Sequence, residues 1–248
     1  MMFSDYGAET YGQRIAGFYD TWVAPVVEGT TEVAAAFLAD LAGDGAALEL
    51  GIGTGRIALP LARRGVHVQG IDASEAMVAR LREKPGGTDI QVHIGDFADV
   101  RVDEQFRLVY VVFNTFFALL TQSDQVRCFH NVAAHLADAG KFVIEAFVPD
   151  PTLFDRGQRV SATRVEMERI QLDVTRHDSA SQQVTSQHVL IGREGITLLP
   201  VQMRYAWPSE LDLMGQMAGL RLEGRYAGWQ LEAFSSASAG HVSVYVRG

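Results

Sequence analysis

One short segment of the chain combines an acid with three regularly spaced glycines. Its sequence is Glu49-Leu50-Gly51-Ile52-Gly53-Thr54-Gly55, and we call it the glycine loop. A glycine lets the backbone approach a ligand closely, because a Cβ atom would occupy the ligand's space. A dinucleotide-binding fingerprint needs its third glycine at position 56, where this chain has Arg56. The spacing therefore favours a ligand that has no pyrophosphate.

Two further acids follow predicted strands. Asp72, with Ala73 after it, lies 21 residues after Gly51, where a carboxylate can accept hydrogen bonds from both hydroxyls of a ribose. Asp96, with Phe97 after it, follows the next predicted strand, where the amino group of an adenine would need an acceptor. Ligands of open α/β sheets bind at the carboxyl ends of the strands, so we expect these acids to converge on the glycine loop.

The pattern of apolar residues predicts the elements that hold these residues. Short apolar runs alternate with helical spacing through the first two-thirds of the chain, which is typical of a parallel α/β sheet. Strands are expected over residues 46–50, 66–71, 90–94, 108–113 and 141–147, and helices over residues 54–64, 74–83 and 124–139. Ser74 is expected to cap the second helix, Gly65 and Gly140 to end the first and third, and Pro60 to kink the first.

The pattern changes after Pro151. Residues 159–206 alternate in the way expected of three or four antiparallel strands, with no helical stretch between them. A helix over 208–219 and strands over 221–226 and 241–246 then resume the first pattern. We therefore expect residues 1–150 and 208–248 to form one domain, with lid helices over 1–45 and an inserted sheet over 151–207.

Composition excludes several classes of protein. The single Cys128 of the 248 residues excludes a disulfide framework and multi-cysteine metal sites. No compact Asp/Glu/His cluster with ligand spacing is left over, so no metal is expected. The net charge of −9 argues against electrostatic binding to nucleic acid or to anionic lipid. With no predicted signal peptide or membrane span, the expectation is a cytoplasmic protein that acts on a small molecule.

The glycine loop, Asp72 and the Gly95-Asp96-Phe97 sequence together resemble class I S-adenosylmethionine-dependent methyltransferases. The resemblance implies a Rossmann-like seven-stranded sheet with an antiparallel insertion after its fifth strand. It also implies S-adenosyl-L-methionine as the cofactor. Contacts to that cofactor are then expected from Glu49, Gly51, Gly53, Gly55, Asp72, Ala73, Asp96, Phe97 and Phe113.

The N-terminal segment extends the resemblance. Residues 11–20 read YGQRIAGFYD, which is similar to a Y-x-x-x-I-A-x-x-Y-D segment of actinobacterial nucleotide-sugar N,N-dimethyltransferases. By this resemblance, this helix lies over the cofactor, Tyr19 contacts the methionine end of the cofactor and Tyr11 faces the acceptor. We further predict that residues 10–42 act as a lid that orders when cofactor binds. The alternative is that both aromatic rings only pack within the lid or the core.

The same resemblance concerns the acceptor site. In that group the insertion forms a wall of this site and often a contact between subunits, which here implies a possible homodimer. His188, Tyr205 and Trp207 of the insertion are candidate acceptor contacts, with ordinary packing in the sheet as the alternative. The loop after the fourth strand offers Asn114 and Phe117, but Ala118 stands where the sugar enzymes have a histidine.

These residues predict methyl transfer to a nitrogen, or to an acidic oxygen, of a small molecule. Tyr11 and Asn114 would orient the acceptor, because a neutral amine needs positioning more than a general base. Asn114 has the alternative role of capping the strand end. The competing functions are an O-methyltransferase with a general base, a cofactor-binding protein without activity, a nicotinamide oxidoreductase and a nucleic-acid methyltransferase.

Overall fold

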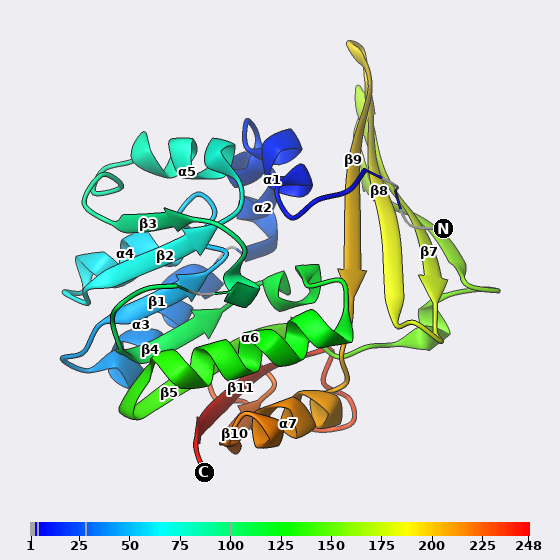
Figure 1. Ribbon diagram of the computed structural model, residues 1–248. Helices are drawn as coiled ribbons and strands as arrows, with labels where there is room; N and C mark the ends of the chain where they lie inside the picture. The colour runs from blue at the N-terminus through cyan, green and yellow to red at the C-terminus, as the bar shows by residue number, and fades with distance from the viewer. Residues whose placement is uncertain (1–2, 4, 28, 100) are drawn as a thin grey trace.

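Two separate β-sheets organise the computed structural model, which describes residues 3, 5–27, 29–99 and 101–248 (Figure 1). The strands of the larger sheet, in spatial order, are β10 (Leu220–Tyr226), β11 (Gly240–Arg247), β5 (Leu136–Phe147), β4 (Phe106–Val111), β1 (Ala47–Leu50), β2 (Val68–Asp72) and β3 (Gln91–Ile94). The five strands from β5 to β3 run parallel, and β11 is antiparallel to both of its neighbours, β5 and β10. This confirms the predicted seven-stranded sheet.

The order of the strands reverses at β1, which lies between β4 and β2. The carboxyl ends of these three strands therefore meet at one edge of the sheet, at the switch point where ligands of such sheets bind. Leu48 and Leu50 pack into one apolar cluster and Ala47 into another, because successive side chains of a strand point to opposite faces. Both faces of β1 are consequently buried.

Helices cover both faces of the larger sheet. One face is packed by α6 (Gln122–His135) and α7 (Pro208–Met217) through side chains such as Phe129 and Leu211. The other is packed by α3 (Thr30–Ala42) and α4 (Ala58–Arg63) through Leu38 and Leu61. The helix α5 (Glu75–Arg82) follows β2 and is capped, as predicted, by Ser74, whose hydroxyl oxygen accepts from the Met77 amide.

The inserted sheet contains four antiparallel strands, in agreement with the prediction. They are β6 (Gln158–Val165), β7 (Arg169–Asp178), β8 (Gln183–Gly192) and β9 (Gly195–Arg204), and they neighbour one another in chain order. Figure 1 shows this sheet standing beside the larger one, with β9 on the side of the N-terminal helices. Those helices are α1 (Thr10–Ile15) and α2 (Tyr19–Val27). None of the described helices is long and apolar enough to cross a membrane.

Several local predictions were wrong. The helix α4 begins only at Ala58, so Pro60 lies in its first turn, where no amide donor is needed, and does not have to kink it. Gly140 ends no helix, because α6 stops at His135 and Gly140 lies within β5. The strand β3 is an edge strand rather than a buried one, and Ile94 is 52% exposed.

Candidate active site

The three glycines of the glycine loop all adopt left-handed backbone conformations. Their φ angles are +72° at Gly51, +56° at Gly53 and +77° at Gly55, a region that other residues rarely adopt. A Cβ atom on Gly51 would lie 2.4 Å from Cγ2 of Thr115, and one on Gly55 would lie 2.3 Å from Cδ1 of Leu81. The loop between β1 and α4 therefore requires glycine at these positions for backbone conformation and for close packing.

Asp72, at the end of β2, is tied to the glycine loop. Its Oδ2 accepts the Gly53 amide at 2.7 Å, and its Oδ1 accepts the Ser74 amide at 2.8 Å. Burial raises the pKa of this carboxyl, and the two amide donors oppose that rise. Each oxygen has a second lone pair, so the carboxylate can still accept hydrogen bonds from the hydroxyls of a ligand. The structure thus brings Asp72, Ala73 and the loop together, as expected.

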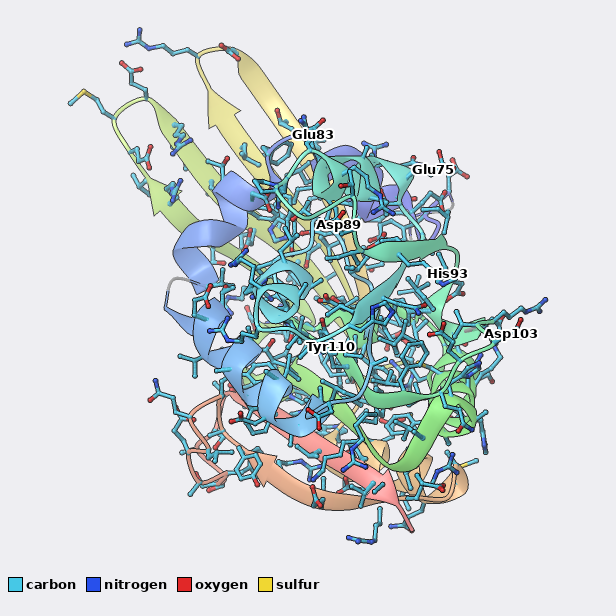
Figure 2. The ribbon with its side chains drawn as sticks, turned by 90° about the vertical axis from the view of Figure 1, so that its left-hand side faces the viewer. Glu75, Glu83, Asp89, His93, Asp103 and Tyr110 are labelled. Carbon is cyan, nitrogen blue, oxygen red and sulfur yellow. The ribbon has the colours of Figure 1, made fainter. Side chains whose placement is uncertain are left out.

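The side chain of Glu49, the first residue of the glycine loop, points into the interior of the fold and not toward the surface. The side chain is buried, and its Oε2 accepts the hydroxyl of Tyr110 at 3.0 Å, in the interior of the fold (Figure 2). Burial raises the pKa of this carboxyl to about 8, against the opposing hydrogen bonds from Tyr110 and from the Ala58 amide. Glu49 therefore joins β1 to β4 through Tyr110 in the interior, and a direct contact from it to a cofactor stays a prediction.

The residues that follow β3 lie beside the glycine loop. Asp96 is exposed and accepts the Ala98 amide on its Oδ1 at 2.9 Å, which starts a short 3-10 helix at Phe97. Phe97 is buried, and its ring lies 3.9 Å from the position of a Cβ on Gly51. Apart from its neighbours in the chain, no residue that the structure describes has an atom within 4 Å of a Cβ built on Gly95. Open space, an aromatic edge and an exposed acceptor fit an adenine at this end of the loop.

The loop after β4 turns through two strained residues. Phe113 and Asn114 have φ angles of +56° and +66°. The Glu145 carboxylate accepts the Phe113 amide at 2.8 Å, and Oδ1 of Asn114 accepts the Phe147 amide at 2.7 Å. Asn114 therefore caps the strand end through its oxygen. Within the described residues, its amide NH2 group has no hydrogen-bond partner, which leaves that group able to orient a ligand.

Phe117 departs from its predicted place. Its side chain is fully buried, with its ring 4.9 Å from that of Phe147 in the core. It packs behind the loop after β4 and is not open to a ligand in this conformation. Ala118, the next residue, is exposed.

The helices α1 and α2 lie against this edge of the sheet. A Cβ on Gly12 would be 2.5 Å from Cβ of Ser74, so α1 packs directly on the start of α5. In α2, the Asp20 carboxylate accepts the hydroxyl of Thr54 at 2.6 Å and pairs with Lys84 at 2.6 Å. The N-terminal segment is thereby fixed to the glycine loop itself.

The two predicted tyrosines both belong to this segment. Tyr11 and Tyr19 both pack with the small apolar cluster of α1 and α5, and Tyr19 also lies close enough to Arg56 to feel its charge. Burial raises the pKa of both phenols, most strongly that of Tyr11. Both are therefore hydrogen-bond donors at neutral pH and not bases.

The candidates from the insertion separate into two places. His188 lies beside the lid, because its ring meets that of Trp22 edge-on, with 4.7 Å between the centroids. Tyr205 is buried at the base of the insertion, where its hydroxyl is 3.0 Å from Nε2 of His177. Trp207 is 39% exposed just before α7. Tyr205 and Trp207 meet each other edge-on, and the Trp207 carbonyl accepts the first amides of α7.

The sequence analysis missed the roles of Arg56 and Asp20. The Arg56 guanidinium lies 5.1 Å from the centre of the Phe113 ring, and its charge opposes the burial-driven rise in the pKa of Tyr19. A lone cation directly after a glycine-rich loop is the signal that could have identified it. The partner of Asp20, Thr54, lies 34 residues away in the chain, and no local pattern predicts such a pairing.

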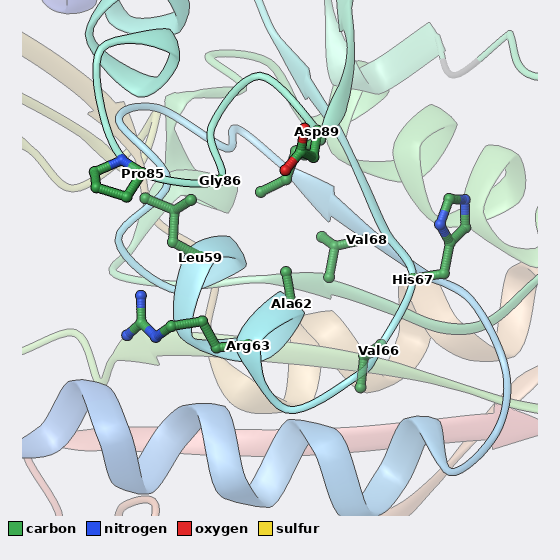
Figure 3. A pocket seen from close by; sticks show the side chains of 10 residues that line it. Leu59, Ala62, Arg63, Val66, His67, Val68, Pro85, Gly86 and Asp89 are labelled. Atoms are coloured by element: carbon green, nitrogen blue, oxygen red, sulfur yellow. The ribbon is translucent and has the colours of Figure 1, made fainter.

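A separate hollow of about 290 Å³ lies between α4 and the segment before β3 (Figure 3). It includes Val68, the first residue of β2, and so lies at the opposite end of that strand from Asp72. Its lining mixes apolar side chains with the polar Arg63, His67 and Asp89. The hollow is therefore distinct from the candidate active site.

Known proteins are similar to this chain in sequence and in fold. Residues 47–140 match a family model described as a methyltransferase domain. The chain is 32% identical over 187 residues to the cypemycin N-terminal methyltransferase of a Streptomyces species, which covers 73% of this chain and 76% of that protein.

Two solved structures of methyltransferases are similar to this chain over nearly all of its length. The CcbJ methyltransferase from Streptomyces caelestis is similar with a TM-score of 0.92 and 36% identity, over 98% of this chain and 100% of that one. S-adenosylmethionine-bound CalS10, an amino pentose methyltransferase from Micromonospora echinaspora, is similar in fold with a TM-score of 0.70 and 23% identity, over 94% and 97% of the two chains.

Proposed function

We propose, from the premise that this chain belongs to the class I S-adenosylmethionine-dependent methyltransferases, that it methylates a nitrogen of a small molecule or peptide. The protein is an enzyme, and its cofactor is S-adenosyl-L-methionine. The family, fold and cofactor predicted from the sequence are thereby confirmed. The nitrogen acceptor, the site residues and the mechanism are our proposals.

The loop after β4 carries the proposal of a nitrogen acceptor. It offers the amide of Asn114 and the exposed Ala118, and residues 113–119 themselves contain no side chain basic enough to take the proton of a hydroxyl acceptor. An amine in its neutral form already has a nucleophilic lone pair. The names of two similar proteins, an N-terminal methyltransferase and an amino pentose methyltransferase, support the same choice.

The edge of the larger sheet would hold the cofactor. We assign Asp72 to the ribose hydroxyls, Asp96 to the adenine amino group, and the glycine loop to close backbone contact. Arg56, beside Tyr19, is placed to pair with the carboxylate at the methionine end. When bound, the cofactor supplies a methyl group on a sulfonium, whose departure leaves a neutral thioether.

The helices α1 and α2 would act as the lid over this site. Their contacts to Ser74 and Thr54 would exclude water from the reacting atoms and fix Tyr11 and Tyr19 in place. The predicted lid over residues 1–45 also contained α3, but α3 packs on a face of the larger sheet. We therefore limit the lid to α1 and α2.

The inserted sheet would serve two purposes through its two faces. The face that carries His188 meets the lid and would form a wall of the acceptor site. The opposite face exposes a set of apolar side chains that are neighbours in the strand register: Val160, Val165, Ile170, Val174, Ile196 and Leu198. An exposed apolar patch of this kind suits contact with a second copy of the chain, which supports the predicted homodimer.

A panel of matched acceptors tests the proposed function. We would incubate the protein with methyl-labelled S-adenosylmethionine and a peptide with a free α-amine, its N-acetylated form, a nucleotide amino sugar, the corresponding hydroxy sugar, and a catechol. Label is expected in members with a free amine and not in their matched partners. Label in the catechol alone would establish the O-methyltransferase alternative. Binding of S-adenosylhomocysteine without any transfer would favour a binding protein.

Tyr11 provides a mechanistic prediction. Replacing Tyr11 with phenylalanine is expected to lower kcat by about 10-fold or less, because a phenol whose pKa is raised by burial orients the acceptor and does not take its proton. Steady-state kinetics with the best amine of the panel would measure this, with cofactor affinity as the control. A loss of several orders of magnitude at unchanged cofactor affinity would identify Tyr11 as the essential base instead.

A further inference from the structure

We infer that His188, oriented by Asp173, removes a proton from the bound ammonium form of the acceptor before the methyl group is transferred. This inference rests on the proposed nitrogen acceptor. Amines carry a proton at neutral pH, since the pKa of an α-amine is about 8 and that of an alkylamine about 10. A protonated nitrogen has no lone pair, so a closed site needs a place for this proton to go.

The pair consists of residues that face each other on neighbouring strands. Asp173 of β7 and His188 of β8 are direct register partners, and Nδ1 of His188 lies 2.5 Å from Oδ1 of Asp173. An ionised carboxylate only accepts hydrogen bonds, so we place a proton on Nδ1 of the imidazole. Nε2 then keeps its lone pair, and it has no hydrogen-bond partner in the described part of the chain. This is the arrangement in which a carboxylate fixes the tautomer of a catalytic histidine.

The pair lies where the lid meets the insertion. Trp22 of α2 meets the His188 ring edge-on, and its Nε1 donates to Oε1 of Gln171, two residues before Asp173 on β7. Asp20, two residues before Trp22 on the same helix, accepts the hydroxyl of Thr54 in the glycine loop at 2.6 Å. The lid helix thus connects the cofactor loop to the face of the insertion that carries the pair.

The polar groups nearest to His188 on its face of the insertion are mostly uncharged: Ser161, Gln171, Thr175 and Ser186. The register partner of His188 on β9 is Leu199, and the register partner of Asp173 on β6 is Ser161. Trp22, from α2, is uncharged. Arg159 and Arg164 of β6 lie on the same face by register, beside Thr175 and Gln171. Asp173 is the charged group within hydrogen-bond distance of the His188 ring, so its carboxylate would be the main charge that stabilises the imidazolium.

Other candidate bases are occupied or distant. Tyr11 and Tyr19 stay protonated, and Glu49 is buried against Tyr110. His241 is buried, with its pKa lowered to about 4, and its Nδ1 bonds to Ser243.

Two further histidines are excluded by their contacts and position. His177 bonds to Tyr205 and stacks on Phe154 at the base of the insertion. His93 lies on β3, on the opposite side of the molecule from the insertion (Figures 1 and 2). Of the histidines near the lid, His188 therefore has the free nitrogen.

In the proposed step, proton removal from the acceptor precedes methyl transfer. An N–H bond of the acceptor ammonium breaks, and the proton forms a bond with Nε2 of His188 while Nδ1–H stays bonded to Asp173. The amine lone pair then forms the N–C bond to the methyl group, as the C–S bond breaks and sulfur keeps the electron pair. The methylated product leaves as an ammonium ion, and the imidazolium releases its proton to water.

The dependence of kcat on pH tests this step. With the fastest amine of the panel at saturation, kcat of the wild type is expected to fall only at a pH below the amine's own pKa. In His188→Asn the fall should move up to the amine's own pKa, with a loss of about 10²- to 10³-fold at pH 7. Asp173→Asn should lose about 10-fold, because the ring remains but its tautomer is no longer fixed. His130→Asn, on the exposed side of α6, is the matched control and should behave as the wild type.

A second readout does not depend on turnover. In the S-adenosylhomocysteine complex, the ¹⁵N chemical shifts of the His188 ring should show a proton on Nδ1 and titration at Nε2. Asp173→Asn should lose that preference. An unchanged pH profile in His188→Asn, or a proton on Nε2 in the neutral wild type, would overturn the inference. Failure of the proposed function is distinguishable, because the wild type would then methylate no amine in the panel.

Discussion

Replacing Gly53 with valine is expected to weaken binding of S-adenosylhomocysteine by at least about 100-fold and to remove methyl transfer with it. Gly53 has a φ of +56°, which a β-branched residue adopts only with strain of about 1–3 kcal/mol. A Cβ at this position would also lie 3.2 Å from Cε of Met77. The Gly53 amide donates to Asp72, so any shift that relieves the strain also displaces the proposed ribose site.

A matched variant separates damage to the site from damage to the fold. Gly65, after α4, has a φ of +89°, and no atom lies within 4 Å of a Cβ built there. Gly65→Val should therefore carry comparable backbone strain and lower the melting temperature, yet leave the affinity for S-adenosylhomocysteine intact. Calorimetric titration of both variants, with their melting temperatures, makes the comparison. Wild-type affinity in Gly53→Val would contradict the place we assign to the glycine loop.

Much of the fold follows from local patterns in the sequence. The parallel strands appear as short apolar runs because helices bury both faces of each one, as at β1. The failures occur where tertiary pairing decides the boundary. A glycine such as Gly140 often ends a helix. Here the chain has already left the helix and paired with β4, because Leu136 is the register partner of Phe106. Ile94 is apolar on an edge strand, and nothing local shows which strand will be at the edge.

The candidate site also contains residues that local patterns predict and contacts that only tertiary packing decides. Topology alone brings Asp72, Asp96 and the glycine loop together, because the carboxyl ends of parallel strands share one edge. The pairing of Asp20 with Thr54 and that of Asp173 with His188 depend on how the lid and the insertion pack. Phe117 sits in a short loop with no periodicity, so its burial could not be predicted.

Replacing Asp72 with alanine is expected to cost roughly 1–3 kcal/mol of cofactor affinity, which is about 5- to 150-fold in Kd. Two effects contribute to this loss. The ribose hydroxyls would lose a charged acceptor, and the amides of Gly53 and Ser74 would lose the carboxylate that joins the glycine loop to α5. Affinity for S-adenosylhomocysteine alone does not tell these effects apart.

A double-mutant cycle with a modified ligand separates the two effects of Asp72. We would measure the Kd of S-adenosylhomocysteine and of its 2′-deoxy analogue for both the wild type and Asp72→Ala. If Asp72 accepts a hydrogen bond from the 2′-hydroxyl, the wild type should prefer the natural ligand, and most of that preference should vanish in the variant. An equal preference in both proteins would mean that Asp72 acts only by holding the loop. The carboxylate would then belong to the architecture of the site, and the ribose would need a different partner.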